Sequence, residues 1–418
     1  MFTAPGQGAQ TPGFLSPWLE LPGLAEQIGA WSELAERDLI RLGTTGSAEE
    51  ITDTSVAQPL LVAAALAAAG LLGEPDAAAG HSVGELAAGA IAGVLSTNDA
   101  IRLTRVRGEA MARACGARGV EGGSSPLGRA EPAAGGDEPT SMIVVLGGDE
   151  ATVLAAIADA GLTPANINGT GQIVAGGTLA QLEAFAANPP AGARLRPLRV
   201  AGAFHTRHMA PAVDALAAAA AAAGTVIKDP SITLLSNADG AVVTSGTNWV
   251  DRIVAQVAAP VRWDLCMATM SDMGVTALIE LPPGGTLTGM AKRALPGVEL
   301  LALKSPDRLD AARELIAAHA QSKNGYPAAP ADLAPAWRIV VSPTAGTFRS
   351  GETGADAPAV AAGATVPAGA LLGQVLARSG ERQVVAPYEA VLVEWLAEDG
   401  DPVGAGQPLV RLEAKESA

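Results

Sequence analysis

Apolar residues along the first three quarters of the chain fall into two patterns. Short continuous apolar runs predict buried strands, and longer stretches that repeat every 3.6 residues predict helices. Strands are expected at residues 1–4, near 77, and at 142–146, 232–235 and 277–280, and the main helices at 60–72, 83–91, 98–114 and 307–320. This alternation is typical of an α/β fold, in which the stretch at 60–72 is a buried helix too short to span a bilayer.

A second pattern lies inside the first. In the middle of this region the order is strand, helix, strand, strand, helix, strand, with the helices at 150–160 and 179–187. That order is the ferredoxin-like arrangement. We therefore expect a ferredoxin-like subdomain at 141–202, inserted into a larger α/β subdomain made of 1–128 and 203–321. Residues 116–140 lack periodicity, are rich in Gly, Pro, Ser and charge, and are expected to form a loop.

The last part of the chain differs in composition. Residues 322–336 are rich in Pro and Ala, which predicts a linker. Beyond it, one segment resembles another 37 residues further on, and a second pair of segments is also alike: 363–372 with 400–409, and 340–343 with 384–387. Such an internal repeat predicts a small pseudo-symmetric β domain at residues 337–415.

Composition excludes some classes of function. The 418 residues carry a formal net charge of −16, which argues against nucleic acid or an anionic membrane as the main partner. The two cysteines, Cys115 and Cys266, are far apart and lack metal-ligand spacing. With no secretory signal in the sequence, they favour a reducing, cytoplasmic location and no metal site.

The segment Gly80-His81-Ser82-Val83-Gly84 carries the most chemical information. Its pattern predicts a nucleophile elbow, a sharp strand-to-helix turn that exposes a serine hydroxyl between two glycines. The following helix would direct its free N–H groups at the serine and stabilise negative charge on a substrate oxygen. From the pattern alone, a glycine-rich turn that happens to contain serine is the alternative.

A nucleophilic serine needs a base within hydrogen-bonding distance. The chain has four histidines: His81, His205, His208 and His319. His81 adjoins Ser82 and is expected to pack, because adjacent side chains point apart at such a turn, and His319 is expected at the surface of a late helix. His205, just after a strand, is therefore the preferred base, with His208 as the alternative.

Several motifs occur in one order along the chain. They are Pro5-Gly6-Gln7-Gly8-Ala9-Gln10, Gly80 to Glu85, Val106-Arg107-Gly108, Ala203-Phe204-His205-Thr206, Ser236-Asn237, Gln256 ahead of Pro260-Val261-Arg262-Trp263, and Pro283-Gly284-Gly285. Over about residues 1–305 the chain thereby resembles malonyl-CoA:acyl carrier protein transacylases and the acyltransferase domains of polyketide synthases. The resemblance implies an α/β-hydrolase-like large subdomain with a ferredoxin-like small one.

The resemblance also implies roles for single residues. Ser82 matches the nucleophile that takes the acyl group as an ester, and His205 matches its general base and then acid. The backbone carbonyl of Gln256 would orient His205, so no acidic triad member is implied. Backbone N–H groups of Gln7 and Val83 would form the oxyanion hole.

Three further residues match the substrate site of the family. Arg107 matches the arginine that pairs with the free carboxylate of the substrate, and Gln58 matches a glutamine beside it. A guanidinium can bind a carboxylate through two parallel hydrogen bonds, whereas the alternative for Arg107 is a solvated helix arginine. Phe204 resembles malonyl-selective members, because its bulk would crowd an α-methyl branch, an effect of about 1–3 kcal/mol. Position 202 is Gly where such polyketide acyltransferases often have His.

The C-terminal half-repeats resemble biotinyl/lipoyl carrier domains, which close as a barrel-sandwich. Those domains carry a modified lysine at the tip of the hairpin between the halves. Here the corresponding residues 377–383 contain no lysine, and the only lysine beyond the linker is Lys415. We therefore expect no attached biotin or lipoate, and a domain that serves docking, to a synthase or carboxylase, or dimerisation. An inert appendage is the alternative.

Together these features predict an acyl carrier protein S-malonyltransferase of fatty acid or polyketide synthesis, working by ping-pong transfer through a Ser82–His205 dyad without a bound cofactor. An editing hydrolase that uses water as acceptor is one alternative, although Arg107 would be superfluous there. A non-catalytic scaffold acting through the C-terminal β domain is the other. Despite the negative net charge, the acidic carrier protein is expected to dock on a local basic patch formed by Arg207, Lys292 and Arg293.

Overall fold

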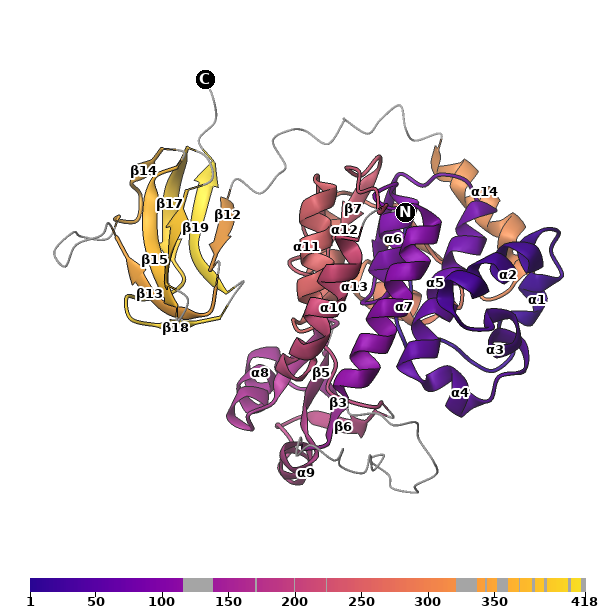
Figure 1. The fold of residues 1–418 in the computed structure, drawn as a ribbon, viewed down its shortest axis with the longest axis horizontal. Coiled ribbons are helices and arrows are strands. Elements are labelled where there is room, and N and C mark those ends of the chain that lie inside the picture. The colour runs from indigo at the N-terminus through magenta and orange to yellow at the C-terminus, as the bar shows by residue number, and fades with distance from the viewer. Residues whose placement is uncertain are drawn as a thin grey trace. The chain divides into compact units, whose positions relative to one another are not determined.

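The computed structural model divides the chain into two compact units, Met1–Lys323 and Asn324–Ala418 (Figure 1). It describes residues 1–115; 138–320 apart from 170, 199 and 223; and 337–414 apart from 343, 352–359, 368, 378–379, 387–388 and 405–406. The linker expected at 322–336, Lys415 and nearly all of the loop expected at 116–140 lie outside these residues. In the described part of the chain, no helix combines the length and apolarity needed to cross a membrane.

The first unit contains a largely parallel sheet in the order β11-β10-β1-β2-β7-β8, in which only the β7–β8 pair is antiparallel. The strands are β1 (Phe2–Ala4), β2 (Ala77–Gly80), β7 (Thr233–Leu235), β8 (Val242–Val243), β10 (Ala277–Glu280) and β11 (Glu299–Ala302). β1, β2 and β10 are buried along their whole length. Strands covered on both faces read as continuous apolar runs, which is why the sequence predicts them.

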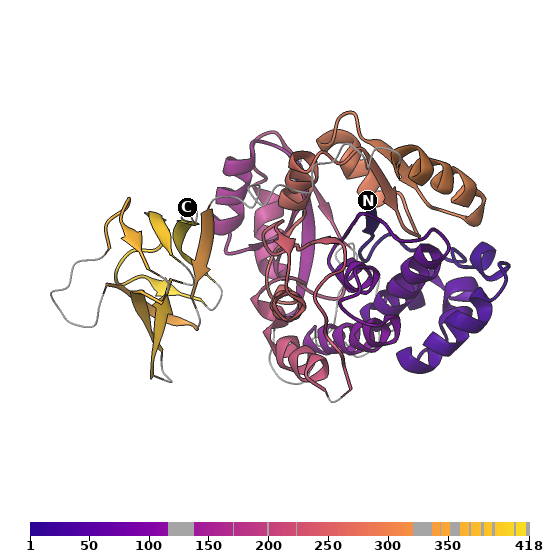
Figure 2. The same ribbon diagram turned by 90° about the horizontal axis from the view of Figure 1, so that it is seen from above.

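Helices surround this sheet, and the indigo ones, α1 to α4, lie at its periphery (Figure 2). Their bounds are α1 (Ser16–Leu19), α2 (Leu24–Ala35), α3 (Leu39–Thr45), α4 (Ala48–Thr52), α5 (Thr54–Gly70), α6 (Gly84–Ile91), α7 (Thr97–Ala114), α10 (Ala210–Ala220), α11 (Gly246–Gln256), α12 (Trp263–Asp272), α13 (Thr286–Ala294) and α14 (Leu309–Ala320), with short 3-10 helices η1 (Arg207–Met209) and η2 (Pro306–Arg308).

The helix expected at 60–72 is α5, which begins earlier because Asp53 caps it by accepting a hydrogen bond from the Ser55 N–H. α5 is alanine-rich and almost wholly buried, and it packs along α7. A Cβ at Gly108 of α7 would lie 2.8 Å from the Thr54 carbonyl oxygen, so the two helices approach closely only with glycine there. This close packing brings the preceding residue, Arg107, next to Gln58.

A second sheet has the order β6-β3-β5-β4-β9. Its elements are β3 (Thr140–Gly147), α8 (Glu150–Asp159), β4 (Thr163–Ile167), β5 (Gln172–Thr178), α9 (Leu179–Ala187), β6 (Ala193–Pro197) and, from the large subdomain, β9 (Val261–Arg262). The first six follow the predicted strand–helix–strand–strand–helix–strand order. The sequence did not predict β9, which pairs in parallel with β4 and joins this sheet to the segment just after Gln256. The sheet therefore extends beyond the predicted boundary at 141–202.

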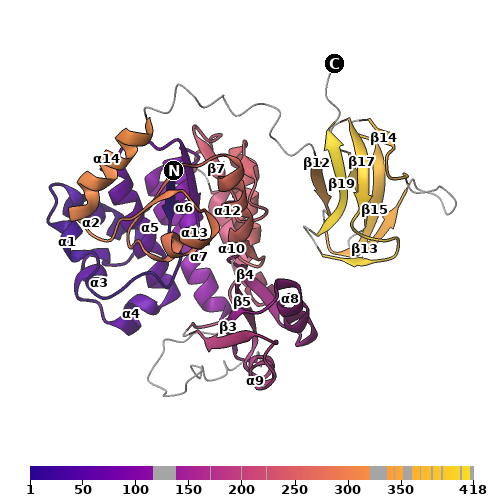
Figure 3. The ribbon, with the colours of Figure 1, turned by 180° about the vertical axis from the view of Figure 1, so that it is seen from behind.

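The second unit contains two four-stranded sheets, β12-β19-β17-β14 and β16-β15-β13-β18 (Figure 3). The strands are β12 (Trp337–Val341), β13 (Gly346–Ser350), β14 (Thr365–Val366), β15 (Leu371–Ala377), β16 (Gly380–Val385), β17 (Ala390–Trp395), β18 (Pro402–Val403) and β19 (Pro408–Ala414). Fully buried side chains such as Phe348, Leu372 and Leu409 form its core.

The two sheets of this unit are related by exchange of the two halves of the repeat. The strands β12–β15 of the first half correspond in order to β16–β19 of the second half. When every strand is exchanged for its counterpart, the strand order of one sheet becomes that of the other. β15, at Leu371–Ala377, maps onto β19, at Pro408–Ala414, with the 37-residue offset seen in the sequence. The repeat is therefore a repeat of structure, with each sheet built from strands of both halves.

Candidate active site

Ser82 lies on a sharp turn between β2 and α6, with a φ of 54°. A Cβ at Gly80 would lie 2.0 Å from the backbone of Gly84, and one at Gly84 would lie 2.2 Å from the Ala4 carbonyl oxygen. Neither position has room for a side chain, which is the steric reason for the two flanking glycines. The left-handed backbone at a residue other than glycine is characteristic of a strained functional turn.

The Ser82 hydroxyl is hydrogen-bonded to His205. Ser82 Oγ lies 2.7 Å from His205 Nε2, and His205 Nδ1 lies 2.8 Å from the Gln256 carbonyl oxygen. A carbonyl only accepts, so Nδ1 carries the proton and Nε2 is left as an acceptor for the serine hydroxyl. His205 also has a positive φ, 58°, a second strained backbone position that the sequence did not indicate.

His205 is a neutral base in this setting. Burial, reinforced by the positive charge of Arg107, lowers the pKa of His205 to about 3. The imidazole is therefore unprotonated throughout the neutral range and available to take a proton from Ser82.

The other histidines have separate surroundings. His81 Nε2 is 2.9 Å from Asn168 Oδ1 and its ring packs edge-on against Trp263, so it is buried and structural, as expected. His319 contacts Thr276 and Glu299 near the end of α14. His208, the alternative base, lies on η1, and its backbone N–H donates to the Thr206 hydroxyl.

Arg107 is 1% exposed, so the alternative of a solvated helix arginine is wrong. Its guanidinium donates to Gln58 Oε1 at 2.9 Å and to Ser82 Oγ and Gln256 Oε1, each at 3.2 Å. Burial lowers the pKa of Arg107 to about 10, which the nearby Glu85 opposes, and the group stays charged at neutral pH. A buried cation therefore lies within hydrogen-bonding distance of the candidate nucleophile.

Two backbone N–H groups near the serine are available for a ligand. Within the described residues, no hydrogen bond uses the backbone N–H of Gln7 or of Val83. The side chain of Gln7 donates to Thr52 and Thr54 and so anchors its own loop. Val83 precedes α6, where the positive end of the helix dipole adds to the field.

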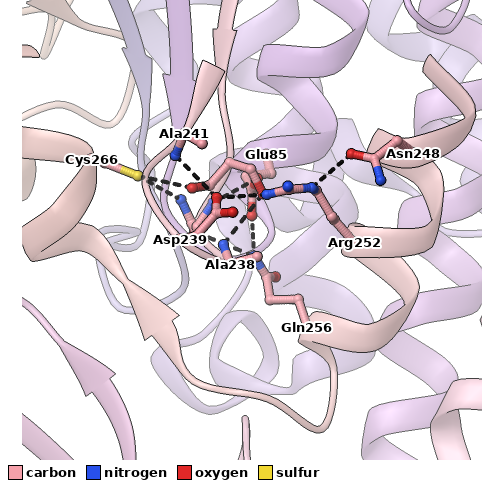
Figure 4. Close-up of polar contacts among 10 residues, drawn as sticks. Glu85, Ala238, Asp239, Ala241, Asn248, Arg252, Gln256 and Cys266 are labelled. Atoms are coloured by element: carbon pink, nitrogen blue, oxygen red, sulfur yellow. Dashed lines mark hydrogen bonds and ion pairs between the residues drawn. The ribbon is translucent and has the colours of Figure 1, made fainter. Parts of the chain in front are cut away.

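Sequence reasoning assigned no role to two buried polar residues in this site. Asn237 Oδ1 accepts from the Ser82 backbone N–H at 2.8 Å, and Asn237 Nδ2 donates to the Gly80 carbonyl oxygen at 2.7 Å, so Asn237 holds both sides of the turn. Glu85 accepts from Asn237 and Gln256 (Figure 4). Both residues belong to the motifs that carry the family resemblance, and this was the one sequence feature that could have indicated a role for them.

Phe204 and Gly202 affect the space around the site through their size. Phe204 is buried in the main core beside His205. A Cβ at Gly202 would lie 2.3 Å from Cys115 Sγ, so the histidine often found at this position in the related polyketide enzymes would not fit here. No group of three or more His, Cys, Asp and Glu side chains suited to a metal ion occurs in the described part of the chain.

Comparison with known proteins agrees with this geometry. Residues 1–307 match the acyl transferase domain family. The malonyl CoA-acyl carrier protein transacylase of Mycobacterium tuberculosis is 54% identical over 314 residues, which cover 73% of this chain and 97% of that protein.

Two solved structures have the same fold over the first unit. The crystal structure of MCAT from Mycobacterium tuberculosis matches with a TM-score of 0.68 at 53% identity, covering 75% of this chain and 98% of that one. A type II PKS acyl-carrier protein in complex with its malonyl-transacylase matches with a TM-score of 0.65 at 28% identity and the same coverage. With the match over residues 1–307, these likenesses show that the chain belongs to the acyl transferase family, the family of the malonyl CoA-acyl carrier protein transacylases.

Proposed function

We propose that this chain transfers a malonyl group from malonyl-CoA to the phosphopantetheine thiol of an acyl carrier protein, in the cytoplasm and without a bound cofactor. The observation that carries the proposal is the buried Arg107 guanidinium, 3.2 Å from Ser82 Oγ. A cation at this place suits an acyl group that ends in a free carboxylate. The names and the carrier-protein complex among the relatives support the same substrates.

In the first half-reaction, Arg107 and Gln58 hold the malonyl carboxylate, and Ser82 Oγ attacks the thioester carbon. His205 Nε2 takes the hydroxyl proton while the new O–C bond forms, and the Gln7 and Val83 N–H groups stabilise the oxyanion. The C–S bond then breaks, and His205 returns the proton to the departing sulfur, which releases CoA as its thiol and leaves malonyl-Ser82.

In the second half-reaction the carrier-protein thiol replaces CoA. His205 takes the thiol proton, the sulfur attacks the ester carbon, and the C–O bond to Ser82 breaks as the proton returns to Oγ. The Gln256 carbonyl holds Nδ1–H throughout, so the imidazolium that forms in each half is stabilised by a fixed dipole. CoA leaves before the carrier protein reacts, so the enzyme alternates between its free and malonyl-Ser82 forms, which makes the kinetics ping-pong.

Intact-mass analysis of the full-length chain tests this proposal. Malonyl-CoA alone should add one malonyl group to the protein, and holo-acyl carrier protein should then remove it and gain the same mass. If the chain gains acetyl from acetyl-CoA as readily as malonyl, or releases the group to water faster than to carrier protein, an editing hydrolase is the better description.

For the folds of the parts, we propose an α/β-hydrolase-like large subdomain, a ferredoxin-like small one and a biotinyl/lipoyl-like barrel-sandwich at the C-terminus. The exchange of half-repeats between the two C-terminal sheets supports the last assignment. The β15–β16 hairpin that joins the halves contains no lysine, so no biotin or lipoate can be attached there by an amide. We propose that this unit docks a synthase or carboxylase.

Ending the chain at Lys323 should leave an active transferase. The first unit contains every candidate site residue, and its relatives are complete at about that length. We expect malonylation by malonyl-CoA within about twofold of the full-length rate, since no site contact is removed. The measurement is the initial rate of mass gain, with circular dichroism to establish folding. A folded but inactive truncated protein would mean that the C-terminal unit completes the active site.

The carrier protein should depend on exposed basic residues that lie close in sequence to the matched motifs. Arg207 begins η1 shortly after His205, and Lys292 and Arg293 lie in the last turn of α13; all three are exposed. Reversing the charge of Arg207 or Lys292 should raise KM for carrier protein by roughly 3- to 10-fold and leave malonylation by malonyl-CoA unchanged. Arg102→Glu, on the exposed face of α7, is the matched control. An unchanged KM in every variant would exclude this patch.

A further inference from the structure

We propose that Glu85 is a positioning residue for malonyl transfer: as an ionised, acceptor-only side chain it fixes the amide of Gln256, and through it both Arg107 and His205. This proposal rests on the function proposed above. Glu85 is the buried acidic group beneath the site that the mechanism leaves unused. It is 1% exposed and lies in the first turn of α6, one helical turn after Ser82.

Both groups that face the Glu85 carboxylate are donors. The Asn237 backbone N–H donates to Oε1 at 3.0 Å, and the Gln256 side-chain amide donates to Oε2 (Figure 4). An ionised carboxylate can only accept, so it satisfies both donors. A glutamine or a protonated glutamate would point a hydrogen at one of them, and an unpaired buried donor is costly.

The orientation of the Gln256 amide follows from the chemistry of its neighbours. A guanidinium can only donate, so Gln256 must turn Oε1 toward Arg107, as it does at 3.2 Å. Its amide nitrogen is then left to face Glu85. If Glu85 stopped accepting, the Gln256 amide nitrogen would keep only Asn237 Oδ1, at 3.3 Å, as an acceptor, and the amide orientation that holds Arg107 would be less firmly fixed.

The same residue also connects Glu85 to the catalytic base. The Gln256 carbonyl oxygen accepts from His205 Nδ1, while Asn237, the second donor to Glu85, accepts from the Ser82 N–H. One carboxylate thus holds the residues that orient the base, the serine turn and the carboxylate-binding arginine. If Glu85 only stabilised the fold, its hydrogen-bond partners would not need to be the same residues that contact Ser82, His205 and Arg107.

A surface ion pair keeps the two donors to Glu85 together. Arg252, one turn before Gln256 on α11, donates to Asp239 at 2.6 Å, on the turn that carries Asn237. Arg252 also donates to Asn248 Oδ1, and Asp239 accepts from the Ala241 N–H (Figure 4). α11 and the turn after β7 are therefore fixed to each other on the outer side of the carboxylate.

The charge state of Glu85 makes the proposal testable by pH. Burial raises the pKa of Glu85 to about 8, against the Asn237 N–H, the charges of Arg107 and Arg252, and the Gln256 amide. Cys266 of α12, whose own pKa burial and this carboxylate raise, and His205, neutral at these pH values, are the other titratable groups facing the cluster. Because the ionised form makes both bonds, malonylation should speed up as pH rises through about 8.

The experiment compares Glu85→Gln with Glu280→Gln in the full-length chain. Glu280 is an equally buried glutamate, but its carboxylate accepts from three backbone N–H groups at the start of α13, and none of these bonds involves Ser82, Arg107 or Gln256. Rates of Ser82 acylation are measured by intact mass with malonyl-CoA and with acetyl-CoA between about pH 6 and 9, together with melting temperatures.

Glu85→Gln should slow malonylation by about 10- to 100-fold, slow acetylation less, and remove the pH dependence near 8. Glu280→Gln should lower the melting temperature and leave both the malonyl-to-acetyl ratio and the pH profile as they are. A paired exchange, Glu85→Gln with Gln256→Glu, satisfies every donor again. It should restore acetylation and melting temperature toward wild type but not the malonyl preference, because the new carboxylate would pair with Arg107 directly.

The proposal is overturned if Glu85→Gln keeps the wild-type ratio and pH profile, or if it changes only the melting temperature as the Glu280 control does. It is also overturned if the paired exchange is no better than the single variant. Failure of the wild-type chain to accept malonyl at all would instead overturn the proposed function, so the two failures are distinguishable.

Discussion

Replacing Ser82 with alanine should abolish the gain of one malonyl unit on incubation with malonyl-CoA. The Ser82 hydroxyl is the group that faces His205 Nε2, at 2.7 Å, so its loss removes both the attacking atom and the proton that the base accepts. Removing the nucleophile of a serine enzyme lowers kcat by about 10⁴-fold or more, which places residual transfer below detection by mass. The readout is the intact mass after complete reaction of the wild-type protein.

The control for this variant is Ser231→Ala, which loses one serine hydrogen bond, to the Ala92 carbonyl, outside the site. It should acylate at the wild-type rate. A malonyl group that still appears on the Ser82→Ala protein would place the acyl group on another residue and refute the assignment of the nucleophile.

Arg107→Ala should convert the preference of the enzyme from malonyl toward acetyl. The wild-type guanidinium is buried, charged and within hydrogen-bonding distance of the serine, so a substrate carboxylate bound there would form charge-assisted hydrogen bonds with it. Losing them should cost malonyl transfer about 2–3 kcal/mol, a 30- to 150-fold fall in kcat/KM, while an acetyl group has no carboxylate to lose.

Two variants control for other consequences of this change. Arg102→Ala, on the exposed side of the same helix, should leave both substrates unaffected. Arg107→Lys keeps the charge but not the two-pronged geometry, and should fall between wild type and Arg107→Ala. If malonyl and acetyl transfer fall by the same factor in Arg107→Ala, the arginine is holding the site together and is not selecting the substrate.

Local sequence patterns were sufficient for the strands and helices that the sequence predicts and for the serine turn, but not for β8, β9 and β11. Gly80 and Gly84 are required because a Cβ at either position would lie 2.0 or 2.2 Å from a backbone atom. The motif itself indicates this requirement, since it places glycine on both sides of the serine. The helix at 98–114 begins at Thr97, with Ser96 as its cap, and the helix at 179–187 matches α9 residue for residue. Periodicity and capping act over a few neighbouring residues, so a single sequence reports them.

Contacts between residues far apart in the sequence could not be predicted from local patterns. The sequence left Arg107 undecided between a solvated and a substrate-facing side chain, because helix periodicity alone does not say what covers each face. Its burial depends on Gln58 and Gln256, which are 49 and 149 residues away along the chain. The pairing of β9 with β4 depends likewise on two segments that no local pattern connects.

What the sequence by itself determined is therefore most of the strands, the main helices, the serine turn, the preference for His205 as base and the repeat at the C-terminus. Each depends on local sterics, on periodicity or on the small number of histidines. The tertiary structure alone decided that Arg107 is buried, that each C-terminal sheet contains strands of both half-repeats, and that Glu85 accepts from two donors. Those outcomes follow from hydrogen-bond complementarity between residues brought together only by folding, and a buried polar group must find its partners wherever the fold places them.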